Sequence, residues 1–151
     1  MNQQRCVKFF AACAVLGFAI TNLAAQSAPG EVNVPTGEVS LGSVELPRQV
    51  MANGETLVSG AYDVFVTAAQ ADPEAPGQLA VLERWVEFRQ AGAVQGREVV
   101  SIVPGSEISD VAKSAPPASG TARIETLREN EYLRIWVNQS DTHYFIHLVV
   151  S

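Results

Sequence analysis

From residue 43 onward, apolar and polar residues alternate along most of the chain with a period of two. Such alternation predicts strands that turn one face to a core and the other to solvent. Clusters of Gly, Pro, Asn and Asp interrupt it, and Asn53-Gly54 signals a tight turn because both residues tolerate positive φ. We predict strands at 43–46, 56–58, 61–67, 79–90, 97–103, 121–127, 132–137 and 142–150.

Residues 79–90 fit both a strand and a helix. As a strand, Val86 and Phe88 share one apolar face, whereas as a helix Trp85 and Phe88 fall on the same side. Glu, Leu and Arg in this segment also favour a helix. We favour a strand, because the β-branched run at 97–103 has the composition of its hairpin partner.

The last predicted strand, 142–150, is apolar on both faces, as expected at the centre of a sheet. The longest interruption, 104–120, has room for one or two helical turns at 106–113, with Ser106 as the candidate N-cap. Seven or eight short strands with almost no helix predict an all-β domain. We expect an antiparallel β-sandwich or small barrel over residues 43–151, preceded by a helical signal segment.

The first 25 residues have the pattern of a secretory signal peptide. Residues 1–8 carry two positive charges and no acid, and residues 9–20 are an unbroken apolar stretch. The small residues Ala24 and Ala25 then precede the predicted cleavage. Cleavage there yields a secreted or periplasmic domain.

Two other interpretations of the N-terminal segment stay open. The stretch 9–25 nearly reaches the roughly 20 apolar residues of a membrane span, so an uncleaved anchor is possible, although Thr21 and Asn22 interrupt it. A lipoprotein attached at Cys13 is disfavoured, because the apolar run before that cysteine is too short.

Removal of the signal changes the composition of the domain. Both cysteines, Cys6 and Cys13, leave with it, so we expect no disulfide in the mature chain. Eight basic residues then stand against 16 acidic ones, a net charge of −8. Such a charge argues against nucleic acid and against anionic membrane surfaces as partners. Residues 26–42, rich in Gly, Pro, Ser and Glu, are expected to be a flexible lead-in that contributes at most an edge strand.

No catalytic or metal-binding motif is recognisable in the sequence. His143 and His147 are four residues apart, but on a strand that places them about 13 Å from each other, too far to share one metal ion. A Gly-x-Ser-x-Gly elbow and a phosphate-binding loop are also missing from the sequence. We therefore expect no catalytic residue, no metal and no cofactor. A hydrolase or metal-dependent enzyme whose site assembles in space is the alternative.

The two tryptophans are the candidate ligand-contacting residues. In the strand interpretation, Trp85 points to the same side as Glu83, Glu87 and Arg89, and an aromatic ring on a charged face suits a sugar or a partner surface. Trp136 likewise shares a face with a charged residue. The competing interpretation is that both rings pack under a loop or against an arginine.

Two stretches resemble known proteins. Leu46-Pro47-Arg48 followed by Gly54 to Val64, with Gly60-Ala61-Tyr62, resembles a unit of transthyretin-like and carboxypeptidase-regulatory-like β-sandwich modules, in which a Tyr after a Gly turn fills the sandwich corner. Trp85-Val86-Glu87-Phe88, Gly96 to Val100 and Tyr132 to Val137 look like a group of small exported bacterial proteins without an assigned function. These likenesses imply a fold and a compartment, and no activity.

Taken together, the sequence predicts an exported, non-enzymatic β-domain with a binding or structural role in the cell envelope or periplasm. Its expected partner is an envelope protein or a glycan, with membrane contact only through an uncleaved N-terminal segment. The alternatives are the enzyme named above and a carbohydrate-binding module that uses Trp85 or Trp136.

Overall fold

A computed structural model of the chain describes residues 34–71 and 83–151. The predicted signal segment, 1–25, lies outside the described residues, as do residues 26–33 of the lead-in and 79–82 of the ambiguous segment.

The described residues form an all-β antiparallel fold of nine strands with three short helical elements. The strands are β1 (Val39–Leu46), β2 (Val50–Ala52), β3 (Glu55–Leu57), β4 (Gly60–Gln70), β5 (Glu83–Gln90), β6 (Ala93–Pro104), β7 (Thr121–Leu127), β8 (Tyr132–Gln139) and β9 (Thr142–Val150). The helical elements are η2 (Gly105–Glu107), α1 (Ile108–Val111) and η3 (Arg128–Asn130).

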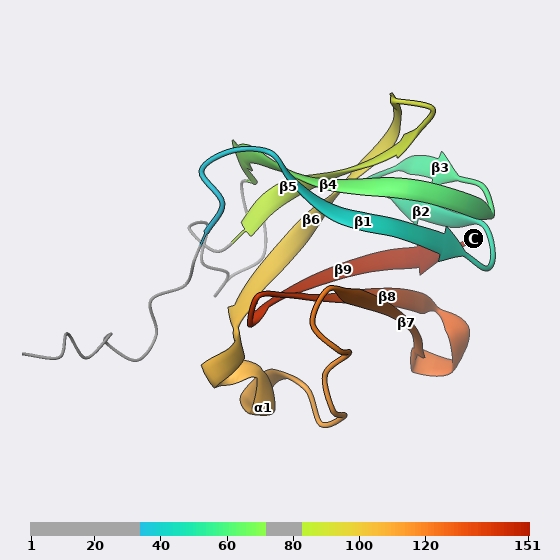
Figure 1. Ribbon diagram of the computed structural model, residues 1–151. Coiled ribbons are helices and arrows are strands. Elements are labelled where there is room, and N and C mark those ends of the chain that lie inside the picture. Colours follow the sequence, from blue (N-terminus) through green and yellow to red (C-terminus); the bar gives the residue numbers. More distant parts are fainter. Residues whose placement is uncertain (1–33, 72–82) are drawn as a thin grey trace, which may run out of the picture.

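The strands are hydrogen-bonded in the order β1-β4-β5-β6-β9-β8-β7, and the β2–β3 hairpin pairs with the C-terminal end of β9. The sheet bends so that two layers face each other. In Figure 1, β1, β4 and β5 form one layer and β7, β8 and β9 the other, while the long strand β6 crosses between them. The core lies between the layers, and the other face of each layer points outward.

Alternation along each strand places the apolar side chains in this core, as the period of two predicts. Each strand therefore buries its inner face in the core, and the burial of this apolar area is the main stabilising contribution to the fold. The residues with at most 1 % exposure in this cluster include Leu46, Val50, Leu57, Val64, Val66, Val86, Phe88, Val100, Ile102, Leu133, Ile135, Ile146 and Leu148.

Several element predictions are confirmed. Residues 83–90 form a strand rather than a helix, and it pairs with β6 in a hairpin. The last strand, 142–150, is central, with β8 along one edge and β6 and β2 along the other. Asn53-Gly54 forms the predicted turn, with φ values of 44° and 86°. β6 begins at Ala93, before the predicted start at 97, because Ala91 and Gly92 make the whole turn after β5.

The lead-in contributes to an edge strand, as we expected. β1 begins at Val39, inside the segment 26–42, and continues across the expected boundary at residue 43 to Leu46 at the edge of the sheet. A bulge at Gly42, where φ is +89°, shifts the register between Ser40 and Gly42. Leu41 and Val44 therefore both face the core although they are three residues apart, which hides the strand from a search for strict alternation.

The predicted helical turns are present at Gly105–Glu107 and Ile108–Val111, but Ser106 does not cap them. No side chain makes a capping hydrogen bond at either element, and Glu107 occupies the N-cap position of α1. Within the described ranges, no helix has the length and apolarity needed to cross a bilayer.

Tyr62 closes one corner of the core. Its side chain is 2 % exposed and meets the Phe88 ring edge-on, with 6.1 Å between ring centroids. Its hydroxyl donates a hydrogen bond to the carbonyl of Val58, four residues upstream, at 2.9 Å. A tyrosine that bonds back to the preceding turn fixes how the chain enters the strand, and here it fixes the start of β4.

Candidate functional site

The outer face of the sheet has two different halves. Over β8 and β9 it is covered by the connection between β6 and β7, residues 105–120, which we call the cap segment. Over β4, β5 and β6 it carries a row of polar and aromatic side chains. We call this second half the Trp85 face, and it comprises Phe65, Thr67, Trp85, Glu87, Arg89, Arg97 and Val99.

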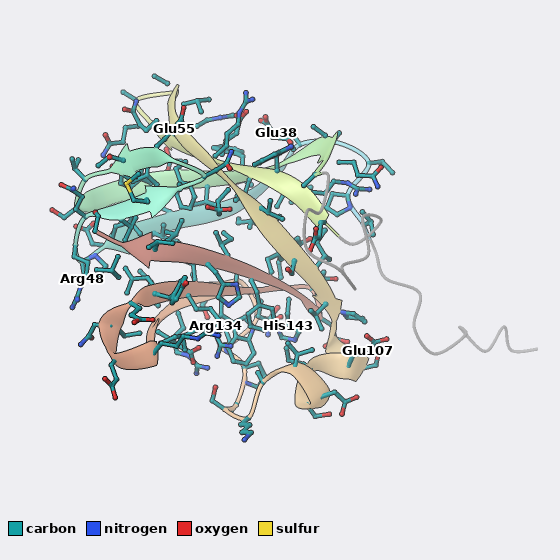
Figure 2. All side chains as sticks on the ribbon, turned by 180° about the vertical axis from the view of Figure 1, so that it is seen from behind. Glu38, Arg48, Glu55, Glu107, Arg134 and His143 are labelled. Carbon is teal, nitrogen blue, oxygen red and sulfur yellow. The ribbon has the colours of Figure 1, made fainter. Side chains whose placement is uncertain are left out.

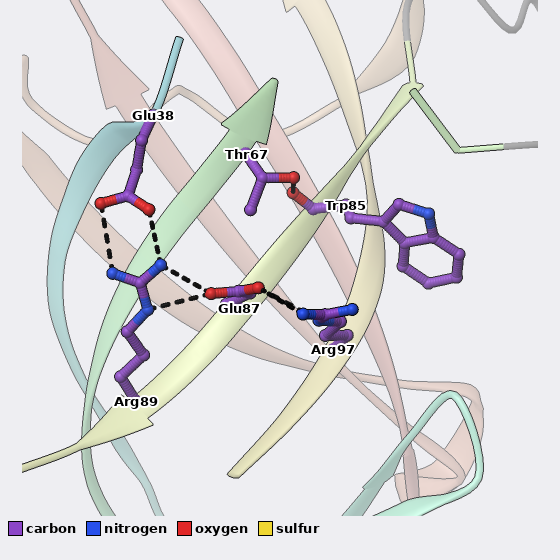
Figure 3. A network of polar contacts seen from close by, with 6 residues as sticks. All are labelled: Glu38, Thr67, Trp85, Glu87, Arg89 and Arg97. Atoms are coloured by element: carbon purple, nitrogen blue, oxygen red, sulfur yellow. Dashed lines mark hydrogen bonds and ion pairs between the residues drawn. The ribbon is translucent and has the colours of Figure 1, made fainter. Parts of the chain in front are cut away.

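The Trp85 face is organised by a chain of ion pairs that crosses three strands (Figure 3). Glu87 stands at its centre on β5 and contacts Arg89 on one side and Arg97 of β6 on the other. Arg89 in turn holds Glu38, which precedes β1. Alternation on β5 and its register with β6 bring these groups to one face.

The distances show that the central carboxylate is fully engaged. Its Oε2 accepts from Nε and Nη2 of Arg89 at 3.0 and 2.6 Å, and its Oε1 accepts from Nε of Arg97 at 3.1 Å. Arg89 donates to both oxygens of Glu38, at 3.2 and 2.5 Å. Such bidentate pairs hold planar groups in a defined orientation.

Electrostatics and ring contacts fix Arg89 further. Its guanidinium lies 4.4 Å from the centroid of the Phe65 ring, a cation–π contact. The hydrogen bonds that Arg89 donates to Glu38 and Glu87 raise the pKa of Arg89 above its ordinary range. The hydrogen bond from Arg89 likewise lowers the pKa of the Glu38 carboxyl. Both groups are therefore charged across the physiological pH range.

Trp85 lies beside this chain on β5 and is partly exposed. Its backbone carbonyl accepts a hydrogen bond from the hydroxyl of Thr67 at 3.1 Å, which ties it to β4. The indole extends from the sheet away from the ion pairs (Figure 3). Trp85 is thus an aromatic ring at the edge of a fixed array of donors and acceptors, on the same side as Glu83, Glu87 and Arg89, as we predicted.

Replacement of Glu87 by glutamine is expected to lower the free energy of unfolding by about 1–2 kcal/mol, because both arginines lose a charged acceptor at a site where the glutamate is 7 % exposed. Glu38→Gln is the matched control, and we expect a smaller change because half of the Glu38 side chain is exposed. Urea unfolding monitored by circular dichroism measures both. Equal losses for the two variants would contradict the central position of Glu87.

Trp136, the second predicted ligand-contacting residue, is covered by the protein itself. Its side chain is 0 % exposed, and it packs with Phe145 and Ala112 in a small cluster that is separate from the main core. Val103 and Ile108 complete this cluster. The expectation of an exposed ring at Trp136 therefore needs correction, because the cap segment covers the face on which it lies.

Two arginines lie over the Trp136 ring. Arg123 lies 4.8 Å and Arg134 5.6 Å from its centroid, and both pair with Glu125. Burial works to raise the pKa of Glu125, but the two arginines bring it below its ordinary value. The competing sequence interpretation, a tryptophan packed under a loop and against an arginine, therefore describes Trp136.

Hydrogen bonds attach the cap segment to the sheet at both ends. The amide of Gly105 donates to the carbonyl of Asp141 at 2.7 Å, and the amide of Gly120 donates to the carbonyl of Asn138 at 2.7 Å. The Asn138 side chain donates to the carbonyl of Pro117 at 2.8 Å. The cap segment is thus part of the folded domain.

The two histidines lie on the same side of β9 but in different surroundings. His143 is 2 % exposed beneath the cap segment, where its Nδ1 accepts a hydrogen bond from the indole N–H of Trp136 at 3.1 Å. Figure 2 shows it on the same side of the sheet as Arg134, above the turn that carries Glu107. His147 is exposed. Within residues 34–71 and 83–151, no three His, Cys, Asp or Glu residues group as a metal site.

We expect the stability of the protein to fall as the pH drops below about 6.5. Burial lowers the pKa of His143, against a smaller opposing effect of Asp141, so the folded state holds this histidine neutral. The unfolded chain binds its proton first, and stability is complete above the unfolded pKa and lost toward lower pH, by at most about 1.4 kcal/mol per pH unit.

Urea unfolding between pH 8 and pH 5 measures this slope. His143→Gln, which has no titrating ring, should flatten the slope more than His147→Gln does. His147 contributes in the same direction, because partial desolvation of its ring and the charge of Arg134 lower its pKa, but its side chain is exposed and we expect the smaller effect there. A wild-type slope of zero over this range would contradict the buried, neutral state of His143.

Sequence reasoning found Trp85, Glu87 and Arg89 but missed Glu38 and Arg97. Arg97 begins the run 97–103, which was interpreted only by its β propensity, without regard to the charge of Arg97. Glu38 was assigned to a flexible segment, and only the register between β1 and β4 brings it to Arg89. The sequence did contain one indication of this network, because acidic and basic residues occur close together on both sides of the β5–β6 turn.

The carboxylate of Glu87 and the Nδ1 of His143 both accept hydrogen bonds from protein donors. Comparison with protein-family models, with curated proteins and with solved structures finds no match.

Proposed function

We propose that this chain is an exported, non-enzymatic binding domain of the cell envelope or periplasm, and that its Trp85 face holds a glycan. The proposal includes an antiparallel β-sandwich as its architecture, like the secreted modules that Gly60-Ala61-Tyr62 resembles. The observation that carries it is the contrast between the two tryptophans. The cap segment covers Trp136 completely, whereas Trp85 remains partly exposed beside groups held in fixed positions.

A sugar ring suits this combination of groups. The apolar face of a pyranose packs against an indole, and its hydroxyls both donate and accept hydrogen bonds. Arg97, on the neighbouring strand, presents hydrogen-bond donors on the same face as Trp85, and 58 % of its side chain is exposed. Its Nη2 lies 2.9 Å from Oε1 of Glu87, which holds the guanidinium in place. Protein side chains that are already ordered lose little conformational entropy when a ligand binds. The alternating charges also leave no net charge that would select an ionic ligand.

The test is native affinity electrophoresis of the purified protein in gels that contain soluble envelope polysaccharides, with a pull-down on insoluble peptidoglycan. We expect retardation or retention of the wild type and at least a tenfold weaker affinity for Trp85→Ala. Tyr132→Ala is the matched control, because Tyr132 is a partly exposed aromatic on the outer face of β8. Its affinity should equal that of the wild type.

Two results would overturn the proposal: no retention on any glycan, or equal losses for Trp85→Ala and Tyr132→Ala. Export is tested separately by fractionation of the producing cells. The protein recovered from the periplasm or medium should begin near Gln26. A chain that keeps its first 25 residues and sediments with membranes would instead support the uncleaved anchor.

A further inference from the structure

A cavity lies at the end of the two layers, beside the Glu38–Arg89 pair. Its volume is about 380 Å³, within the range of small-molecule sites. The segment just before β1 forms one wall, and the turn between β8 and β9 forms another. The polar residues that line it are Thr36, Glu38, Gln139, Ser140, Thr142 and Tyr144.

A second cavity of about 280 Å³ adjoins the first between β1 and the β7–β8 hairpin, and Gln139 lines both. The walls of the second cavity are less polar and include Leu41 and Val137. Gly42 and Gly120 also line it, and neither has a heavy atom within 4 Å of the position that a Cβ would occupy. The two cavities therefore meet at Gln139, and the space around this residue has a polar end and a more apolar end.

The side chain of Gln139 is the polar anchor of this space. Its Oε1 is buried and has no hydrogen-bond partner among the described residues. A buried acceptor without a donor costs about 1–3 kcal/mol, so such an atom is ordinarily satisfied by a ligand group or an ordered molecule. Because Gln139 lines both cavities, a molecule in either of them lies beside its side chain.

Charge limits what this space accepts. Among the described residues that line the larger cavity, Glu38 alone is charged, and Arg89 engages both of its oxygens. An anion would lie beside the Glu38 carboxylate without a cation of its own, and a cation would have to compete with Arg89. The remaining groups are hydroxyls and an amide, which suit a neutral partner. Burial also raises the pKa of Tyr144, so its hydroxyl keeps its proton at neutral pH.

We propose that this cavity is a binding site for a small uncharged molecule that bears hydroxyl and amide groups, with Gln139 as its main hydrogen-bond partner. The segment that contains Thr36 and Glu38 forms the outer wall, and the Glu38–Arg89 pair holds this wall against the sheet. The site adjoins the Trp85 face through the Glu38–Arg89 pair, but it does not depend on the function proposed there.

The test is a two-dimensional amide NMR titration of the purified protein with N-acetylglucosamine, which carries both kinds of group. Glucosamine and glucuronate are the charged probes on the same ring. We expect saturable shifts at the amides of Thr36, Gln139 and Tyr144 with N-acetylglucosamine, and at least tenfold weaker binding of both charged probes.

Gln139→Leu keeps most of the side-chain volume and removes the acceptor. We expect it to raise the dissociation constant at least tenfold while the melting temperature stays the same or rises, because an unpaired buried oxygen is lost. Gln95→Leu, at an exposed position on β6, is the matched control and should bind as the wild type does.

Absence of saturable shifts with N-acetylglucosamine, or unchanged binding by Gln139→Leu, would overturn the proposal and leave a water-filled cavity only. Trp85→Ala separates this result from the glycan proposal. That variant should keep the shifts at Gln139 and Tyr144, and their loss would show that the probe binds at the Trp85 face instead.

Discussion

Replacement of Trp136 by alanine is expected to lower the free energy of unfolding by about 3–5 kcal/mol. The indole is completely buried between the sheet and the cap segment, so its removal leaves a cavity and also deprives His143 of its donor. Phe145, 4.9 Å away between ring centroids, and Ala112 lose their main contact. Denaturant unfolding followed by far-ultraviolet circular dichroism measures the change.

Trp85→Ala is the control for this prediction, since it removes the same side chain from the other half of the outer face. Trp85 is partly exposed, and we expect a loss of about 1 kcal/mol. The Trp136 variant should also expose the cap segment to proteases, with cleavage between residues 105 and 120. Equal losses for the two tryptophans, or an intact cap segment in the Trp136 variant, would contradict the division of the outer face.

The second large effect is expected for Phe88→Ala, again about 3–5 kcal/mol. Phe88 is 0 % exposed on the inner face of β5 and packs edge-on against Tyr62 of β4. The same strand carries Trp85 and Glu87 on its outer face. Loss of the Phe88 ring is therefore expected to destabilise the core and also to make the placement of Trp85 and Glu87 on the outer face less well defined.

Phe65→Ala is the matched control, because Phe65 lies on the neighbouring strand and points outward under Arg89. Its ring is half-buried, and we expect a loss of about 1 kcal/mol from area and the cation–π contact. Thermal unfolding of both variants at one pH measures the difference. A larger loss for Phe65 than for Phe88 would show that the inner and outer faces have been assigned the wrong way round.

The strands that lie between clear turn signals could be predicted from the sequence. β7 and β9 have the predicted bounds, because each begins and ends at a recognisable turn. Only the second half of β1, at 43–46, was predicted, because the bulge at Gly42 breaks the alternation before it. β2 has only three residues, too few to show a period. The order of the strands depends on pairing between segments far apart in the sequence, so a local pattern of residues does not predict it.

The candidate site shows the same limit. Alternation on β5 correctly placed Trp85, Glu87 and Arg89 together. The same rule placed Trp136 on an outer face, correctly, but the outer face of β8 is covered by the cap segment. Residues 105–120 lie 16 to 31 positions before Trp136 in the sequence, and no periodicity indicates which face such a loop covers. Cover by a distant loop, rather than strand direction, decides which tryptophan a ligand can reach.

The fluorescence of Trp85 alone is the most direct test of the central claim that the uncovered half of the outer face binds a ligand. The chain has two tryptophans, so Trp136→Phe leaves Trp85 as the only indole, and Trp85→Phe leaves Trp136. Each variant is titrated with the glycan that retains the wild type in the affinity gel, with acrylamide as quencher. We predict that Trp85 is quenched in the free protein, and that the glycan shifts its emission to shorter wavelength and protects it. Trp136 should resist quenching throughout. A glycan response from Trp136, or none from Trp85, would contradict the account.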